Sequence, residues 1–387
     1  MTLKNPVYLY VCIWLVVLVL YQMHLSNVLI PLSDATTSYV VASCLSFAIP
    51  GILFSIICIG RRNPTREIYV QSNVNNKLRI LIYFWLFFTA IETVCFGPFP
   101  ILSFFGIPTA LYTEWGFSGL HGLLNSTIIV LSNYSFYFFL SKKDKKYLLY
   151  FFLCLMWAII LVTRQMLMSM VIEAFFIFFF TGQLKIKTVL KVGLIGFLIV
   201  FIFGLLGDLR SGGDAFLYLA DPTPAFPTFL PSGFLWVYIY ITSPLNNINY
   251  NMPTYQPFTF SFTDAASQLV PSVIREKIFG PPAGEFKLVN EFLNVGSAHT
   301  TFLSGFGYNG ALIVFFLMGI FCTYVFMKYC NNRVNIKWIF ILVVLCHNIT
   351  MSVFVDFFTN LVFTFQIILH FWIGSSLKQQ GARYAEI

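Results

Sequence analysis

The sequence predicts an all-α polytopic membrane protein, and three observations support this class. Hydrophobic residues make up 58% of the chain and charged residues only 10%, whereas an average soluble domain carries about 25% charged residues. The mean hydropathy is +0.80. The apolar residues also stand in long unbroken runs, whereas a membrane β-barrel would show short alternating segments.

Ten apolar runs are long enough to be candidate spans, because a membrane-crossing helix needs about 20 residues. The first run is too long for a signal-peptide core, so it is expected to remain as an anchor. With no separable soluble domain, residues 1–387 are predicted to form a single integral-membrane domain. The runs cover residues 7–30, 37–60, 78–97, 119–141, 147–163, 165–182, 188–207, 301–328, 338–356 and 358–377.

The positions of the basic residues orient these spans. With the N-terminus in the cytoplasm, the basic connections 61–79, 142–146, 185–191 and 328–337 and the C-terminus all fall on the cytoplasmic side. This distribution follows the positive-inside rule. The net charge of +8 therefore mostly reflects topology, and nucleic acid is not an expected partner.

One long connection, 208–300, is predicted on the outer side. Its segment FLWVYIYI is apolar but lies between Pro231 and Pro244 and is too short to span. We expect a re-entrant or interfacial helix there, with its aromatic side chains at the headgroup level. We find neither internal repeats nor interrupted helices of the transporter kind.

Five basic residues fall on the outer side, where topology does not account for them: Arg164, Arg210, Arg275, Lys277 and Lys287. Arginine presents a planar fork suited to two phosphate oxygens, and lysine adds a point charge. Each residue also has an ordinary explanation. Arg164 could cap its turn and reach the headgroups. Arg210 could pair with Asp208 or Asp214. Arg275 and Lys277 could form a solvated helix face with Glu276, and Lys287 could simply be solvated.

Ionisable groups on the apolar helices are weaker candidates, although intramembrane charges are functional candidates by default. Asp356 is expected at a helix turn that water can reach. His121 is expected to start the fourth span on the outer side. No carboxylate–histidine ladder with i, i+4 spacing appears along one helix. The other groups are Glu92, Glu173, His24, His347 and His370.

Motifs for cofactor chemistry are missing from the sequence. It has no P-loop, HExxH, CxxC, GxSxG or DxD-type metal pair. We therefore expect neither a metal nor a cofactor. The eight cysteines stand in or beside apolar runs and are expected to act as small buried hydrophobes.

The order of these features resembles a known family. GLHGLLNS is followed by the arginine-bearing turn TRQMLMSMV, an outer GDLR, the aromatic loop segment YIYITSPLNN and then HTTFLSGFGYNGALIVFFLMG. This arrangement is similar to the bacterial oligosaccharide repeat-unit polymerases of the O-antigen type, Wzy. The resemblance covers nearly the whole chain, but it rests on architecture and loosely spaced residues.

The resemblance implies a metal-independent glycosyltransferase of the C type at the periplasmic face of the bacterial inner membrane, with both termini cytoplasmic. Such enzymes transfer the growing glycan from undecaprenyl diphosphate onto the next lipid-linked repeat unit. The implied partners are the lipid-linked donor and acceptor, membrane lipids and a chain-length regulator.

The chemistry implied by the resemblance assigns roles to the outer residues. The departing diphosphate gains charge in an oxocarbenium-like transition state, which positioned cations would stabilise. Arg164, Arg210, Arg275 and Lys277 are expected to bind the diphosphate. His299 is the expected base, with Asp208 or Glu291 as the fallback.

Two alternatives stay open at this point. An O-antigen ligase has the same architecture and chemistry but transfers finished polymer to the lipid A core. A flippase or other transporter of lipid-linked sugars belongs to a different class.

Overall fold

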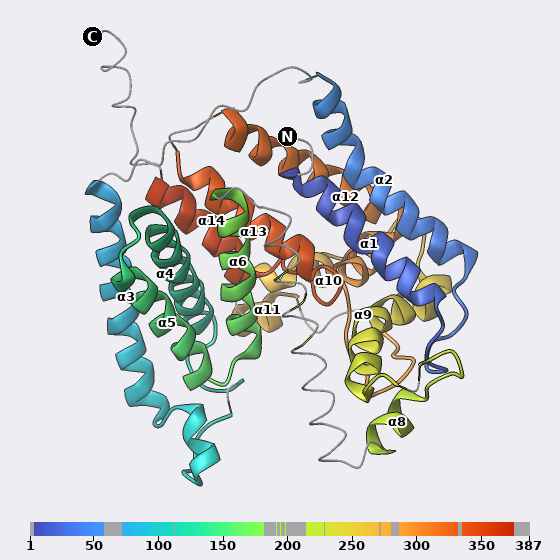
Figure 1. Ribbon diagram of the computed structural model, residues 1–387, viewed down its shortest axis with the longest axis horizontal. Helices are drawn as coiled ribbons and strands as arrows, with labels where there is room; N and C mark the ends of the chain where they lie inside the picture. The colour runs from blue at the N-terminus through green and yellow to red at the C-terminus, as the bar shows by residue number, and fades with distance from the viewer. Residues whose placement is uncertain are drawn as a thin grey trace.

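A computed structural model describes residues 4–57, 72–111, 113–181, 191, 194, 198, 214–227, 229–270, 272–279, 286–331 and 335–374. Within these ranges the secondary structure is helical, apart from one isolated bridge between Ser26 and Pro222. Figure 1 shows a bundle of tilted helices with shorter helices gathered below and beside it.

Nine of the ten predicted spans coincide with helices, and the tenth, 188–207, lies almost wholly outside the described residues. Five helices, α2, α3, α4, α6 and α12, are long and apolar enough to cross a membrane, so the chain is a multi-pass membrane protein. The nine are α1 (Pro6–Gln22), α2 (Asp34–Ile57), α3 (Ser72–Phe96), α4 (Leu120–Lys142), α5 (Lys145–Ile160), α6 (Arg164–Thr181), α12 (Ala298–Asn331), α13 (Lys337–Met351) and α14 (Leu361–Gly374).

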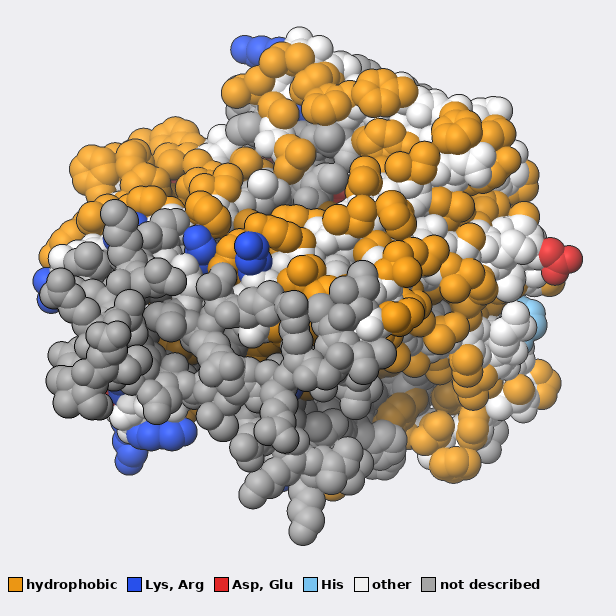
Figure 2. All heavy atoms as spheres, turned by 90° about the horizontal axis from the view of Figure 1, so that it is seen from above, with side chains coloured by type: hydrophobic (Ala, Val, Ile, Leu, Met, Phe, Trp, Pro, Cys, Tyr) orange, Lys and Arg blue, Asp and Glu red, His pale blue; other side chains and the backbone are white. Residues whose placement is uncertain are grey.

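Successive helices alternate in direction from α1 to α6 and again from α12 to α14 (Figure 1). We call the end where α1, α3, α5 and α13 begin the basic end, and the end where α2, α4, α6, α12 and α14 begin the loop end. Figure 2 looks onto the basic end, where Lys and Arg side chains outnumber Asp and Glu side chains among the coloured residues. The described parts of two predicted basic connections, residues 77–79 and 142–146, lie at this end.

The bundle consists of two groups of helices joined by α13 and α14. Helices α3, α4, α5 and α6 form one group, in which α4 packs against the other three. Helices α1, α2 and α12 form the second group, on the opposite side in Figure 1. Because α13 contacts α1, α12, α6 and α14, and α14 contacts α4, these two helices connect the groups.

The long connection 208–300 contains the predicted short helices. Figure 1 places α8 and α9 together at the loop end, below α1 and α2. The elements are α8 (Asp214–Ala220), α9 (Ser232–Asn251), η3 (Met252–Thr254), α10 (Phe262–Ala266), η4 (Ser267–Leu269) and α11 (Ser272–Phe279). A further short helix, η2 (Pro100–Phe105), lies between α3 and α4.

Helix α9 is longer than predicted. It begins directly after Pro231, as expected, but continues through Pro244 to Asn251. A proline inside a helix removes one backbone hydrogen bond. Buried amide side chains beyond the proline hold the last turns in place: Asn246 bonds the backbone of Ile30 and Val28 at 3.0 Å each.

Helix α12 is interrupted at Gly307, so the expectation of uninterrupted helices is wrong here. Gly307 has φ 72° and ψ 177°, a conformation that glycine tolerates. The segment 256–261 hydrogen-bonds the interrupted turn: Tyr308 N–H donates to Gln256 O at 3.0 Å and Ser261 N–H to Gly305 O at 2.8 Å. A Cβ on Gly307 would stand 2.4 Å from Gln256 O, so only glycine fits.

Candidate functional site

His299, the expected base, lies in the second group of helices and is completely enclosed. Its Nε2 stands 3.0 Å from the Tyr10 hydroxyl and its Nδ1 3.2 Å from the Tyr39 hydroxyl. The rings of Trp14 and Phe315 lie 4.2 and 4.5 Å from the imidazole, centroid to centroid. The residue has 0% exposure.

This environment limits what His299 can do in the arrangement described. A neutral imidazole has one donor and one acceptor nitrogen, so one tyrosine donates to it and the other accepts from it. Both nitrogens are therefore occupied, and neither faces an open surface. The contacts join α1, α2 and α12, which is a structural role.

The expected diphosphate-binding cations lie at the loop end but on different elements. Arg164 is exposed and is the first residue of α6, directly after the tight turn in which Thr163 N–H donates to Ala158 O at 2.9 Å. Arg275 is half-buried and Lys277 exposed, both on α11. Helix α11 packs against η4, which contacts α14. Asp208 and Arg210 lie outside the described residues.

The structure does not bring Arg164 and His299 together. Helix α6 packs against α4, α5 and α13, whereas α12 packs against α1, α2, α10 and α13. Among the described residues, neither Arg164 nor Arg275 nor Lys277 has an ion-pair partner.

A carboxylate–histidine pair joins α3 and α4 at the loop end. Glu92 Oε2 lies 3.0 Å from His121 Nδ1, and Glu92 Oε1 accepts a hydrogen bond from Phe117 N–H at 2.9 Å. The side chain of Glu92 is 1% exposed and that of His121 17% exposed. The carboxylate is thus buried and held at both oxygens, while the imidazole reaches the surface.

Aromatic rings connect this pair to the turn that carries Arg164. Trp115 packs edge-on against His121 at 5.5 Å and against Trp157 of α5 at 6.3 Å between ring centroids. Trp157 lies on the last turn of α5, just before the turn that leads to Arg164. His121 and Arg164 therefore belong to the same corner of the bundle, at the loop ends of α3, α4, α5 and α6.

A second carboxylate–histidine pair lies inside the bundle. Glu173 Oε1 of α6 is 3.2 Å from His347 Nδ1 of α13, and both side chains are 0% exposed. Asn133 of α4 donates to Glu173 Oε2. With its amide turned so that nitrogen faces the carboxylate, Gln366 of α14 donates to both oxygens at 3.1 and 3.2 Å. Four helices meet at this carboxylate.

Asp356 lies in the connection between α13 and α14, as predicted. However, it is only 2% exposed, so the expectation that water reaches it is wrong. It accepts hydrogen bonds from Phe358 N–H at 2.9 Å and from the Thr359 hydroxyl. Burial raises the pKa of Asp356 to about 6, an effect that these hydrogen bonds oppose.

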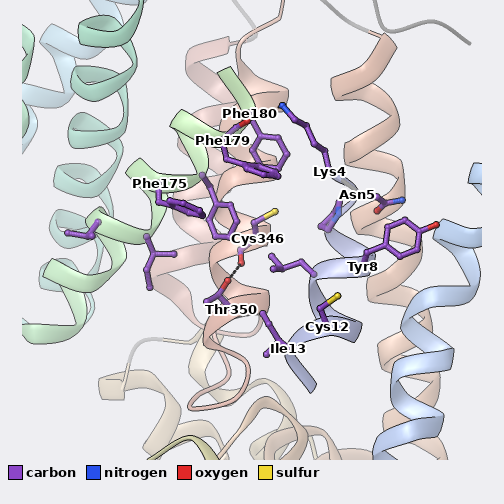
Figure 3. A pocket seen from close by; sticks show the side chains of 15 residues that line it. Lys4, Asn5, Tyr8, Cys12, Ile13, Phe175, Phe179, Phe180, Cys346 and Thr350 are labelled. Carbon is purple, nitrogen blue, oxygen red and sulfur yellow. Dashed lines mark hydrogen bonds between the residues drawn. The ribbon is translucent and has the colours of Figure 1, made fainter. Parts of the chain in front are cut away.

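An apolar cavity of about 660 Å³ lies between α1, α6 and α13 (Figure 3). Phenylalanine side chains of α6 form one wall, and Lys4 stands at the basic end of the cavity. The Lys4 ammonium donates to Phe179 O at 3.0 Å. The lining offers few polar groups, so this cavity is not a site for the transfer chemistry.

Sequence reasoning named all four members of the two carboxylate–histidine pairs but did not pair them. A carboxylate and a histidine one turn apart on a single helix would form a visible pattern in the sequence, whereas here the two partners of each pair come from different helices. The sequence did contain a hint of the outer pair. Glu92 lies about one turn before the end of one helix, and His121 lies at the start of the next helix, so the two were expected at the same end of the bundle.

Comparisons of the chain with protein-family models, with curated proteins and with solved structures find no match, so the geometry of the helices and of these ionisable groups carries the functional argument.

Proposed function

We propose that the chain is an O-antigen-type oligosaccharide repeat-unit polymerase of the bacterial inner membrane. In this proposal the loop end faces the periplasm and the basic end, with both termini, faces the cytoplasm. The donor and the acceptor are both oligosaccharides on undecaprenyl diphosphate. Surrounding lipids and a chain-length regulator are the further partners.

The observation that carries the proposal is the set of cations at the loop end. Arg164, Arg275 and Lys277 lie at the end opposite the topological lysines and have no acidic partner among the described residues. Uncompensated cations at a headgroup level suit a ligand with two phosphates. A lipid diphosphate meets this requirement and also suits a membrane-embedded bundle.

The proposed reaction exchanges two bonds at the anomeric carbon of the donor sugar. The acceptor hydroxyl oxygen forms a bond to C1 while the bond from C1 to the diphosphate oxygen breaks. The leaving diphosphate keeps the electron pair, and Arg164 and Arg275 stabilise its growing charge. The acceptor proton passes to a base. The diphosphate is already a good leaving group, so this chemistry requires no metal and no cofactor.

Deletion of the gene tests the proposed function. A polymerase predicts lipopolysaccharide that carries a single repeat unit, visible on a gel as the loss of the chain-length ladder. Unsubstituted core would point to the ligase or to a transporter. A normal ladder would overturn the proposal.

Variants of the cations test the site. Arg164→Ala and Arg210→Ala are each expected to lower polymerisation by about 100- to 1,000-fold, the usual effect of removing one transition-state donor. Protein level in the membrane should stay unchanged. Lys146→Ala, an exposed lysine at the basic end, is the matched control and should keep the ladder.

The transporter alternative has one observation in its favour. Glu173 and His347 form an intramembrane ionisable pair, and such pairs occur in proton-coupled transporters. A lipid-linked sugar flippase would need this pair for transport, so Glu173→Gln would leave repeat units on the cytoplasmic leaflet. The polymerase proposal predicts instead that units reach the periplasm and remain unpolymerised when Arg164 is replaced.

A further inference from the structure

The His121 imidazole has one nitrogen held and one nitrogen available. Glu92 Oε2 contacts Nδ1 at 3.0 Å, and Phe117 N–H fixes the other carboxylate oxygen at 2.9 Å. A carboxylate accepts hydrogen bonds, so Nδ1 carries the hydrogen and Nε2 carries the lone pair. The same arrangement orients the histidine of a serine-protease triad.

The loop before α4 is built around this pair. Gly116 has φ +100°, and a Cβ there would stand 2.5 Å from His121 Nδ1 and 3.0 Å from Glu92 Oε1. Only glycine allows the loop to pass this close. Trp115 lies edge-on to the imidazole on the same loop. Backbone and aromatic contacts together hold the ring in one orientation.

His121 differs from the other four histidines of the chain in this combination of exposure and support. His299 has both nitrogens occupied by tyrosines, and His347 and His370 are 0% exposed. His24 is exposed, but no carboxylate contacts it among the described residues. His121 alone combines a buried carboxylate partner with access to the surface at the loop end.

We infer that His121 is the general base of the proposed glycosyl transfer and that Glu92 is its positioning residue. This inference rests on the proposed function and replaces His299 in the role of base. As the acceptor oxygen bonds to C1 and the diphosphate departs with its electron pair, the acceptor proton moves to Nε2 of His121. The Glu92 carboxylate stabilises the resulting imidazolium, which later releases its proton to water at the loop end.

The side chains around His121 are mostly uncharged. Glu92 of α3 is the only charged side chain in contact with it among the described residues, and the next acidic residue on its own loop, Glu114, is exposed. Trp115 and Phe117 contribute no charge. Val362 of α14, which faces Gly122, contributes none either.

The test uses the purified full-length protein in lipid nanodiscs with a lipid-linked repeat unit as substrate. His121→Asn is expected to lower kcat about 100- to 10,000-fold with little change in KM, the usual contribution of a general base. Glu92→Gln should lower kcat less than His121→Asn does, because Glu92 acts on the substrate only through His121. His24→Asn is the matched control and should behave as wild type.

A chemical-rescue experiment separates catalysis from folding. Added imidazole should restore part of the rate of His121→Ala in a saturable way, which a purely structural residue would not allow. A wild-type rate in His121→Asn would overturn the inference while leaving the proposed function intact. A folded His121→Ala variant that is inactive and not rescued, with a melting temperature well below wild type, would assign His121 a structural role. If wild-type protein fails to polymerise the substrate, the proposed function itself fails.

Discussion

The two carboxylate–histidine pairs use the same residue types in opposite settings. Glu92 and His121 meet at helix ends, 3.0 Å apart, with the imidazole 17% exposed. Glu173 and His347 meet in the middle of the bundle, 3.2 Å apart, and both are 0% exposed. The first pair can exchange a proton with a substrate or with water, whereas the second is closed to both.

Burial changes what each pair contributes. The inner carboxylate of Glu173 accepts hydrogen bonds from Asn133 of α4 and Gln366 of α14 and lies 3.2 Å from the imidazole of His347 on α13, so it links four helices. An uncompensated charge in an apolar interior is costly, so the partners of Glu173 cannot be removed singly without penalty. The outer pair has fewer partners and an open nitrogen. Buried ionisable pairs in this protein therefore serve assembly, and half-open pairs are available for chemistry.

The largest effect on stability is expected from Glu173→Ala. The variant leaves His347, Asn133 and Gln366 buried without their acceptor, at a cost of about 3–5 kcal/mol. The loss is measured as the change in the free energy of unfolding in detergent, with unfolding induced by heat or by added denaturant. Glu173→Gln keeps an acceptor oxygen and should lose less. Equal stability of Glu173→Ala and wild type would contradict the contrast between the two pairs.

Asp356 extends the comparison to a buried carboxylate that has no imidazole partner. Its raised pKa of about 6 means that the folded state binds the proton more tightly than the unfolded chain does. Its contribution to stability is fully present below about pH 4 and is lost as the pH rises through about 6. The total change is about 3 kcal/mol. Asp356→Asn should therefore gain stability relative to wild type between these pH values, and a constant difference would refute the assignment.

Alanine substitutions at two glycines distinguish the cost of backbone strain from the effect of displacing the Glu92–His121 pair. Gly116 and Gly97 have φ of +100° and +73°, but a Cβ meets His121 and Glu92 only at Gly116. Alanine at either position is expected to cost about 1–3 kcal/mol in stability through its backbone. Only Gly116→Ala should also lower the rate of polymerisation, because it displaces the imidazole. Equal rates in the two variants would argue against His121 as the base.

The smallest effect is expected at the enclosed histidine. Tyr39→Phe removes one hydrogen bond to His299 and should cost about 1 kcal/mol in stability. The rate of polymerisation should not change, because His299 does not contact the substrate in our proposal. A large loss of rate in this folded variant would return the role of base to His299.

The membrane class, the positions of nine helices and the uneven distribution of basic residues could all be predicted from the sequence. These properties depend on hydropathy and charge summed over windows of about 20 residues, and no tertiary contact is needed to read them. For the same reason, Arg164 could be assigned to a tight turn and His121 to the start of a helix.

The pairing of the ionisable groups depended on how the helices pack. Glu92 and His121 are 29 residues apart on different helices, and Glu173 meets its histidine only because α13 packs against α6. Hydropathy places a residue along a helix but leaves the rotation of that helix about its axis open. That rotation encloses His299 between two tyrosines and turns His121 toward the surface, which is why the packing of the helices moved the proposed base from one histidine to the other.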